Sequence, residues 1–501
     1  MSQASVRSKA ITIDSSVISL STCTLVLLGF LQTSDQFIHW FIIPIALSGI
    51  LIGIDAVDWF RGRLGIFDPV GIFGVLGFHF FFIAPLLHVS LDLWLVYVTP
   101  PPDWRPWLGE MAALNFLGLW IYRLVRNMGV SPQCYSPQTV IWKFNRHRFS
   151  LLLTGALIIS ALLQVLVYIK FGGIVSYIET AADANFGAEA FSGMGPLFMF
   201  SESFPILAMI RFVAYAQKKQ SWQTVSVLVT VLILFIILRL FFGGLRGSRS
   251  NTIWAIFWAV GMIHFWIRPI SKKAIALGLA GLVLFMYIYG FFKSGGLEGL
   301  KTAFESQDAR VNMEQTSGRS WKSLLLQDLG RSDIQAFLLY RLTKPDSDYE
   351  YALGRTYWAA TTTLIPGAIF PNRPLSKSKE GTDAQYGMNS YTPGKFESSK
   401  VYGLAGEAML NFGPLAIPLS FIVLGFVVGY VRRCSFTWHP LDTRSLLLPF
   451  LANFCFVVLV SDLDNDIFFL FKQGAFPFFI ILLSSKSYVY PLAGRQIARD
   501  T

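Results

Sequence analysis

Residues 222 to 242 read WQTVSVLVTVLILFIILRLFF, and this stretch decides the class of fold. It is mostly apolar over 21 positions and holds a single charged residue, Arg239. An α-helix needs about 20 such residues to cross the hydrocarbon layer of a bilayer. So long a predominantly apolar segment is uncommon in a soluble domain of ordinary composition. The stretch therefore predicts a membrane-spanning helix.

The rest of the chain repeats this pattern. Of its 501 residues, 53% are hydrophobic and only 14% are charged, and the mean hydropathy is +0.52. We expect an all-α polytopic membrane protein with about twelve transmembrane helices, although tight connections near the C-terminus leave eleven or thirteen open. The expected spans are 15–33, 37–57, 66–88, 105–125, 149–169, 195–216, 222–242, 251–268, 273–292, 403–430, 444–461 and 467–484.

The formal charge of +11 is distributed as membrane orientation requires. Lys and Arg gather in alternate connections, which is typical of the cytoplasmic face, so the charge does not indicate nucleic-acid binding. Both termini are then expected in the cytoplasm, and no cleavable signal peptide is expected. The basic segments are Arg7 to Lys9, Arg61 to Arg63, Arg123 to Arg148, Lys218 to Lys219, Arg268 to Lys273, Arg432 to Arg444 and Lys486 to Arg499.

One long polar segment, residues 294 to 402, interrupts the series of spans. It holds 13 Lys and Arg against 12 Asp and Glu, so it is nearly neutral. Long loops are exempt from the charge rule, and we place this one on the external, periplasmic side. The chain then divides into a membrane bundle at 1–293, the external loop at 294–402, and a second membrane part with a cytoplasmic tail at 403–501. None of the four cysteines lies in the loop, so no disulfide is expected to hold it.

The segment GGLRGSRS at residues 243 to 250 combines glycines with two arginines at an outer helix start. Glycine lets a ligand approach the backbone closely, and a helix N-terminus adds partial positive charge. Arg246 and Arg249 are therefore candidates for an anion-binding site. The alternative is that both side chains reach out to lipid headgroups.

The external loop contains two further patterns. Leucines and aromatics at helical spacing between Ser317 and Thr343 predict an amphipathic helix that rests on the membrane or caps a cavity. After Lys344 the loop is rich in proline, glycine and aromatics, including Tyr357 and Trp358. Such aromatic faces suit sugar rings, and they also suit a membrane interface.

Three motifs carry a resemblance to a known family. They are Gly247-Ser248-Arg249-Ser250 before a span, the loop stretch 351–374 that ends in Ile-Phe-Pro-Asn-Arg-Pro, and GLAGEAMLNFG at 403–413. In the order of these motifs, and in the side of the membrane on which each is expected, the chain resembles the O-antigen polymerase (Wzy), or oligosaccharide repeat-unit polymerase, family. It departs from the family where Pro366 is followed by Gly367 and not by arginine, so the role of that arginine is either absent or taken by Arg373.

The resemblance implies a fold like that of GT-C-type membrane glycosyltransferases such as O-antigen ligases. It also implies the reaction, in which a growing glycan moves from a polyprenyl diphosphate carrier onto a lipid-linked repeat unit at the outer face of the bacterial inner membrane. The implied partners are polyprenyl-diphosphate-linked oligosaccharides and membrane lipids, with a chain-length regulator and a flippase as candidate protein partners. No cofactor is expected.

The residues fit this chemistry. No Gly-x-x-x-x-Gly-Lys-Ser/Thr loop is present for a nucleotide, so the leaving group would arrive with the lipid. Without a metal, fixed cations must meet the charge that develops on a departing diphosphate, and arginine suits this role. The candidates are Arg246 and Arg249, with Arg331, Arg355 and Arg373 from the loop. Each loop arginine could equally form an ion pair with one of the acidic residues there.

The acceptor hydroxyl needs a base. Glu407, at the outer start of the tenth expected span, is the first candidate, because burial would raise its pKa. Its alternative role is capping of a helix N-terminus. Asp333 and His88 are weaker candidates, so Glu407, Arg249 and Asp333 form the catalytic set. The acidic run from Asp462 to Asp466 is interpreted as a solvated turn, and no metal site is expected.

Two alternatives to the polymerase stay open. An O-antigen ligase would differ only in its acceptor. A transporter or flippase of lipid-linked oligosaccharide belongs to another class, and would be expected to show internal repeats and charged residues within its membrane helices.

Overall fold

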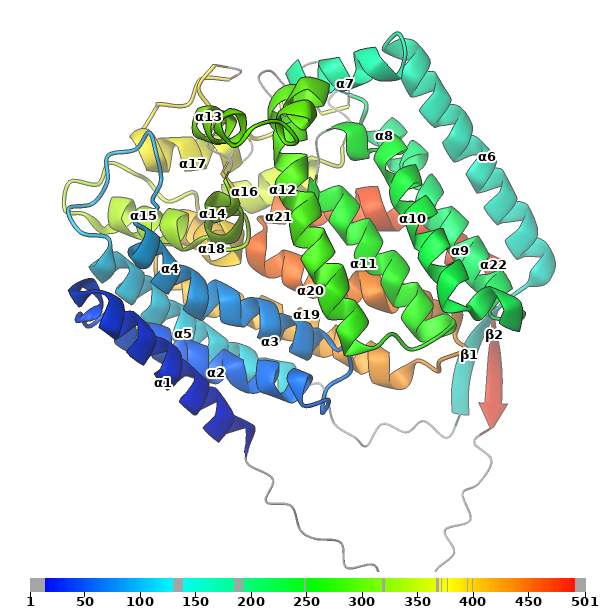
Figure 1. Cartoon of the computed structure of the whole chain (residues 1–501), viewed down its shortest axis with the longest axis horizontal. Coiled ribbons are helices and arrows are strands. Elements are labelled where there is room, and N and C mark those ends of the chain that lie inside the picture. Colours follow the sequence, from blue (N-terminus) through cyan, green and yellow to red (C-terminus); the bar gives the residue numbers. More distant parts are fainter. Residues whose placement is uncertain are drawn as a thin grey trace, which may run out of the picture.

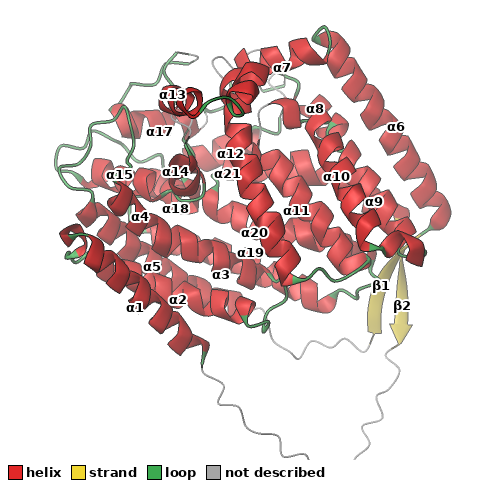
Figure 2. Ribbon diagram, viewed as in Figure 1, coloured by secondary structure: helices red, strands yellow, loops and turns green. Residues whose placement is uncertain are grey.

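The computed structural model describes residues 14–128, 138–183, 191, 193–246, 249–317, 320–365, 369–370, 372–375, 377–393, 395–398 and 400–491. Figure 2 shows that this part of the chain is a bundle of helices with one small two-stranded sheet at its edge.

Nine helical segments in the described ranges have the length and apolar composition to cross a membrane. The predicted class, an all-α polytopic membrane protein, is confirmed at this level. The nine are α1 (Ser15–Thr33), α2 (Ile42–Phe60), α3 with α4 (Pro69–Phe78 and Ala84–Leu91), α6 (Arg146–Lys170), α8 with α9 (Gly195–Ser201 and Phe204–Ala216), the first part of α12 (Lys272–Thr302), α19 (Ala416–Thr437), α20 (Leu448–Val460) with the turn before it, and α21 with α22 (Leu463–Phe469 and Phe476–Ser484).

Three more helices occupy the other predicted span positions. They are α5 (Arg105–Met128), α10 (Val225–Phe241) and α11 (Arg249–Trp266). α5 packs between α2 and α19, and it carries a buried Arg126 whose guanidinium donates to both carboxylate oxygens of Asp55 at 2.5 and 2.9 Å. A charge in the bundle is thus neutralised by a partner on the neighbouring helix. The total of twelve spans stays a prediction.

Two apolar cores share α20, the helix labelled near the middle of Figure 1. One core joins α2, α3, α5, α15, α18 and α19, and it includes Val458 of α20. The other joins α6, α9, α10, α11 and α22, and it includes Val457 of α20. Adjacent residues of one helix therefore face opposite halves of the molecule. α20 holds the halves together and fixes the place of the turn that follows it.

The remaining helices lie at the end of the bundle away from the sheet (Figure 1). Most belong to the segment predicted as the external loop, and α7 comes from the earlier glycine-rich connection. Their bounds are α7 (Ile174–Asp183), α13 (Gln307–Ser317), α14 (Trp321–Ser323), α15 (Ser332–Thr343), α16 (Arg355–Thr362), α17 (Lys377–Tyr386) and α18 (Gly403–Phe412).

The sheet was not predicted. β1 (Gln138–Phe144) pairs antiparallel with β2 (Ser485–Pro491), with Val140 opposite Val489. Both strands are rich in β-branched and aromatic residues, which favour extended backbone. They come from segments predicted to share the cytoplasmic face, and the sheet brings them together. Likewise the Lys272 ammonium donates to the carbonyls of Trp59 and Phe60 at 2.5 and 2.9 Å, which joins two other basic connections.

The predicted tenth span, 403–430, is wrong. The helix stops at Phe412, and Gly413 takes a φ of +82°, a left-handed conformation that favours glycine. Pro414 follows, and a second helix, α19, begins at Ala416 and runs to Thr437. The crossing helix is therefore α19. α18 is a short buried helix beside it, and the packing of α18 positions Glu407.

The predicted amphipathic helix over 317–343 is also wrong in extent, and of its two predicted places the membrane surface is wrong. A π-helical turn at Leu324–Asp328 and a φ of +154° at Arg331 break the segment before α15 begins. Nearly every residue of α15, from Ser332 to Leu339, is buried. α15 therefore packs among α5, α17 and α18, inside the protein and not on a membrane surface.

Candidate functional site

Glu407 lies on α18 with only 3% of its surface exposed. One carboxylate oxygen accepts a hydrogen bond from Thr356 Oγ1 at 2.7 Å, and the other accepts from the backbone N–H of Leu463 at 2.6 Å. Burial, reinforced by the negative charge of Asp462, raises the pKa of Glu407 from 4.5 to about 8. A carboxyl group with such a pKa exchanges protons near neutral pH, as a general base must.

Asn411 holds Glu407 in place, one helical turn further along α18. Its amide nitrogen donates to Thr356 Oγ1 at 2.7 Å and to the backbone carbonyl of Glu407 at 2.8 Å. Its amide oxygen accepts from the N–H of Gly354 at 2.9 Å. α16 and α18 are thereby joined by hydrogen bonds, which fixes the rotamer of Thr356 and its contact with the carboxylate.

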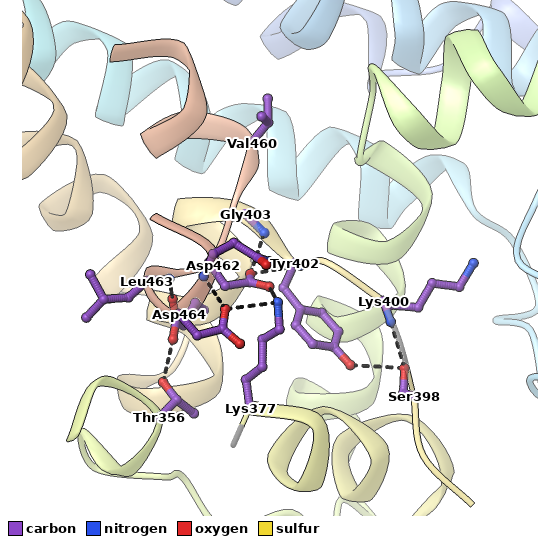
Figure 3. A network of polar contacts seen from close by, with 12 residues as sticks. Thr356, Lys377, Ser398, Lys400, Tyr402, Gly403, Val460, Asp462, Leu463 and Asp464 are labelled. Atoms are coloured by element: carbon purple, nitrogen blue, oxygen red, sulfur yellow. Dashed lines mark hydrogen bonds and ion pairs between the residues drawn. The ribbon is translucent and has the colours of Figure 1, made fainter. Parts of the chain in front are cut away.

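Asp462, in the turn between α20 and α21, is fully buried. Figure 3 shows one of its carboxylate oxygens accepting from the N–H groups of Tyr402 and Gly403, at 2.9 and 2.8 Å. The other oxygen is paired with the ammonium of Lys377 from α17, which also lies 3.2 Å from Asp464. Burial raises the pKa of Asp462, and Lys377 opposes this. The expectation of a solvated acidic turn is wrong, because loop helices cover the turn and supply a buried cation.

Asp466 is the next acidic residue on α21 and is 6% exposed. Its Oδ1 atom has no hydrogen-bond partner among the described residues. The N–H of Leu463, which donates to Glu407, belongs to the residue three positions before Asp466. Asp466 therefore lies on the same side of α21 as the contact with Glu407. Within the described ranges, no group of three or more His, Cys, Asp or Glu side chains is arranged to hold a metal ion.

A second buried cluster surrounds Glu202, at the junction of α8 and α9. Its carboxylate lies 2.8 Å from an Arg246 guanidinium nitrogen, 3.0 Å from the Lys472 ammonium and 3.9 Å from an Arg239 guanidinium nitrogen. Glu202, Arg239 and Lys472 are each at most 5% exposed. We call these four side chains the cation cluster. Three cations surround one carboxylate, which leaves an excess of positive charge.

Backbone contacts fix the cation cluster. Arg239 donates to the carbonyls of Glu202 and Phe242 at 2.8 and 3.1 Å. Gly243 has a φ of +110°, and a Cβ there would come within 2.5 Å of the Glu202 carboxyl carbon. Glycine is therefore required beside Glu202 for both conformation and space. The guanidinium of Arg246 lies 4.0 Å from the centre of the Phe198 ring, in a cation–π contact.

The last membrane segment joins the two clusters. α21 begins beside Glu407 and carries Asp466, and the π-helical turn Leu470–Ala475 that follows it carries Lys472. Leu463, whose N–H contacts Glu407, lies nine residues before Lys472, which corresponds to about 14 Å along the helix axis. π-helical turns are frequent at functional sites. The same membrane segment thus connects a buried carboxyl group that can take a proton with a buried site that favours anions.

The predicted site residues are distributed unevenly. Arg246 is in the cation cluster, while the side chain of Arg249 lies outside the described residues. Arg331 is close to the Asp462 turn: it donates to the carbonyls of Gln327 and Val460 at 2.5 and 3.3 Å, and burial lowers its pKa. Arg355 pairs with Glu380 at 3.0 Å, and Arg373 is exposed.

Of the remaining predicted residues, Tyr357 borders the site, and Trp358, Asp333 and His88 do not take part in it. Tyr357 is half-buried, and its pKa is raised by burial and by the charges of Glu407 and Asp462, so it borders the site. Trp358, its neighbour, is 60% exposed. Asp333 is buried away from solvent and accepts from Gln327 and from the N–H of Ile334, as a helix-terminal carboxylate does. His88 is fully buried and bonds the carbonyl of Leu93 at 2.6 Å, a structural contact.

Sequence reasoning missed Glu202, Arg239, Lys377, Asp462 and Lys472 as site residues. A signal existed for three of them, because Glu202, Arg239 and Lys472 are charged residues within apolar spans, where ionisable groups usually have a function. No such signal existed for Lys377 among the charges of the loop.

Comparison with known proteins adds no assignment: no protein-family model, curated protein or solved structure matches this chain.

Proposed function

We propose that the protein is a membrane glycosyltransferase that polymerises lipid-linked oligosaccharides. The observation that carries the proposal is the last membrane segment, which links Glu407, a buried carboxyl group with a pKa of about 8, to a buried cluster of three cations and one carboxylate. A base and an anion site are the two parts that glycosyl transfer from a diphosphate needs.

In the proposed reaction, an acceptor sugar hydroxyl attacks the anomeric carbon of the donor glycan. The hydroxyl proton passes to the Glu407 carboxylate as the new glycosidic bond forms. The bond between the anomeric carbon and the diphosphate oxygen breaks, and its electron pair stays on the diphosphate. Arg246 and Lys472 would stabilise this charge, because fixed cations in a water-poor site need no reorganisation when the charge develops.

The resemblance also suggests the substrates and the orientation of the protein in the membrane. The donor would be a glycan on a polyprenyl diphosphate, and the acceptor a lipid-linked repeat unit, as the resemblance to the O-antigen polymerase family implies. The loop helices that cover Glu407 would face the periplasm, with β1 and β2 in the cytoplasm and twelve spans crossing the bacterial inner membrane in a GT-C-like arrangement. A chain-length regulator and a flippase are the proposed protein partners.

A transporter of lipid-linked oligosaccharide is the second candidate. Glu202, Arg239 and Lys472 lie within membrane helices, and buried charges at such places are typical of transport pathways. Glu407 and Asp462, beneath the loop helices, are not explained by this alternative. An O-antigen ligase would use the same chemistry with another acceptor.

The test is reconstitution of the purified protein with lipid-diphosphate-linked repeat units from its source cell, without nucleotide or added metal. We expect the wild type to make a ladder of longer lipid-linked glycans. Glu407→Gln and Arg246→Ala should each slow it about a hundredfold, which corresponds to the ~3 kcal/mol that one transition-state contact contributes.

Arg268→Ala is the matched control, because Arg268 is exposed and belongs to a basic connection outside both clusters, and it should retain the wild-type rate. If the wild type made no ladder and instead moved intact substrate across the liposome bilayer, the transporter would replace the polymerase. Transfer to a lipid acceptor without a ladder would identify a ligase.

A further inference from the structure

The cation cluster has an unbalanced charge. When Arg239, Arg246 and Lys472 are all protonated, they contribute three positive charges against one negative charge from Glu202, so the described side chains carry a net charge of +2. Buried charge without a partner costs several kcal/mol, and a bound anion of charge −2 would neutralise it. Arg246 is the most exposed of the four, at 15% of its side chain, and is the side from which an anion can enter.

Glu202 is a fixed part of this site. Its backbone carbonyl accepts from Arg239 at 2.8 Å, and Gly243 closes the space beside its carboxyl group. Its carboxylate is held between Arg246 and Lys472. A ligand must therefore bind with the negative charge of Glu202 in place.

The donor and the product of the proposed reaction differ in charge. A diphosphate esterified at both ends, as in a lipid-linked glycan, has two acidic oxygens and a charge of −2. Release of the glycan frees a terminal phosphate oxygen, which ionises with a second pKa of about 6. Above that pH the lipid diphosphate product carries −3.

We propose that Glu202 sets the charge of this site so that it holds the doubly charged donor and rejects the triply charged lipid diphosphate product. With the donor bound, the net charge of site and ligand is zero, and with the product bound it is −1. The uncompensated negative charge that is buried with the product weakens its binding, so the spent carrier leaves the site. Glu202 is thus a specificity-determining residue, and this role rests on the proposed function.

Binding of two probes to the full-length protein in lipid nanodiscs at pH 7 tests the inference. Farnesyl diphosphate, with one ester bond, represents the product, and its methyl diester, with ester bonds at both ends of the diphosphate, represents the donor. We expect the wild type to bind the diester at least tenfold more tightly. In Glu202→Gln this preference should fall at least tenfold, through tighter binding of farnesyl diphosphate, while Glu202→Asp should retain it.

Glu179→Gln is the matched control, because Glu179 is an exposed carboxylate on the neighbouring helix α7, and the preference should not change. If Glu202→Gln does not fold, Lys472→Gln tests the inference by removing a positive charge. It lowers the net charge of the site to +1, so both probes should bind more weakly and the preference for the diester should widen at least threefold. An unchanged preference in either variant overturns the inference.

The result separates this inference from the proposed function. A wild type that makes a glycan ladder but binds both probes equally contradicts the role of Glu202 alone. A wild type that prefers the diester but makes no ladder contradicts the polymerase and leaves a charge-selective diphosphate site. Binding of neither probe by the wild type overturns the site itself.

Discussion

Lys377, at the first position of α17, forms an ion pair with Asp462, 85 residues further along the chain and directly before α21. Asp462 in turn accepts hydrogen bonds from the N–H groups of Tyr402, which precedes α18, and Gly403, its first residue. One buried pair therefore connects three elements: a loop helix, the helix that carries Glu407, and the last membrane segment. The geometry around Glu407 depends on this pair.

Lys377→Met should destabilise the protein by about 3–5 kcal/mol, because it leaves Asp462 buried without its cation. The midpoint of thermal unfolding in detergent would fall accordingly. Lys301→Ala is the control, since Lys301 forms an exposed ion pair with Glu298 and should leave the midpoint unchanged. Equal midpoints for Lys377→Met and wild type would show that the pair does not support the fold.

Glu407 makes stability depend on pH. Its pKa is about 8 in the folded protein against an ordinary 4.5, so between these values the folded state binds a proton that the unfolded state does not. The associated stability is fully present below pH 4.5 and is lost progressively as pH rises toward 8. We expect the midpoint temperature of thermal unfolding of the wild type to decrease as the pH is raised from 5 to 8.

Glu407→Gln should have a shallower pH dependence over the same range. Asp462, whose pKa burial also raises, would keep some of the slope in that variant. Glu298→Gln, which removes an exposed carboxylate, should follow the wild type. Parallel curves for Glu407→Gln and wild type would contradict a protonated Glu407 at neutral pH.

Gly381 is the point of closest approach between α17 and the Tyr402 side chain, and a Cβ at this position would overlap the Tyr402 ring. Gly381→Ala should cost about 1–3 kcal/mol, as overpacking of a filled core does. Gly278→Ala on α12 meets no atom within 4 Å and should be neutral or slightly stabilising. Thermal unfolding of the two variants side by side measures the difference. Equal midpoints would mean that α17 can move away from Tyr402.

Labelling of intact cells with a membrane-impermeant maleimide tests the proposed orientation. Phe396→Cys lies in the segment 294–402 and Tyr488→Cys in β2, and both positions are exposed. We expect labelling at 396 in intact cells, and at 488 only after the membrane is opened. The described native cysteines are buried and provide a low background. The reverse pattern would invert the topology.

Much of the fold follows from the sequence because bilayer thickness sets the length of a spanning helix. Eleven predicted spans coincide with helices. The tenth failed because residues 403–412 are apolar for another reason, burial inside the protein, although Gly413 and Pro414 marked the helix end. The long helix predicted across Arg331 failed similarly, since leucine spacing indicates a buried face but not what covers it.

The site was predictable in part. Glu407 stood out as an acid within an apolar helix. Asp462 did not stand out, because clustered acidic residues usually indicate solvated turns. Its burial depends on Lys377, and only the tertiary packing brings Lys377 next to it. Arg239 and Lys472 were visible as charges in spans, but their meeting at Glu202 joins segments that are 37 to 270 residues apart. Such convergence is a tertiary property.

The sheet of β1 and β2 has a consequence for synthesis. Phe144 and its partner Ser485 are 341 positions apart, so β1 leaves the ribosome long before the strand that completes it. At about 5–20 residues per second, β1 waits roughly 20–70 s for β2. During that time its edge is open to any other extended chain. Insertion of the final helix α22 therefore ends a period in which the nascent protein is vulnerable to mispairing.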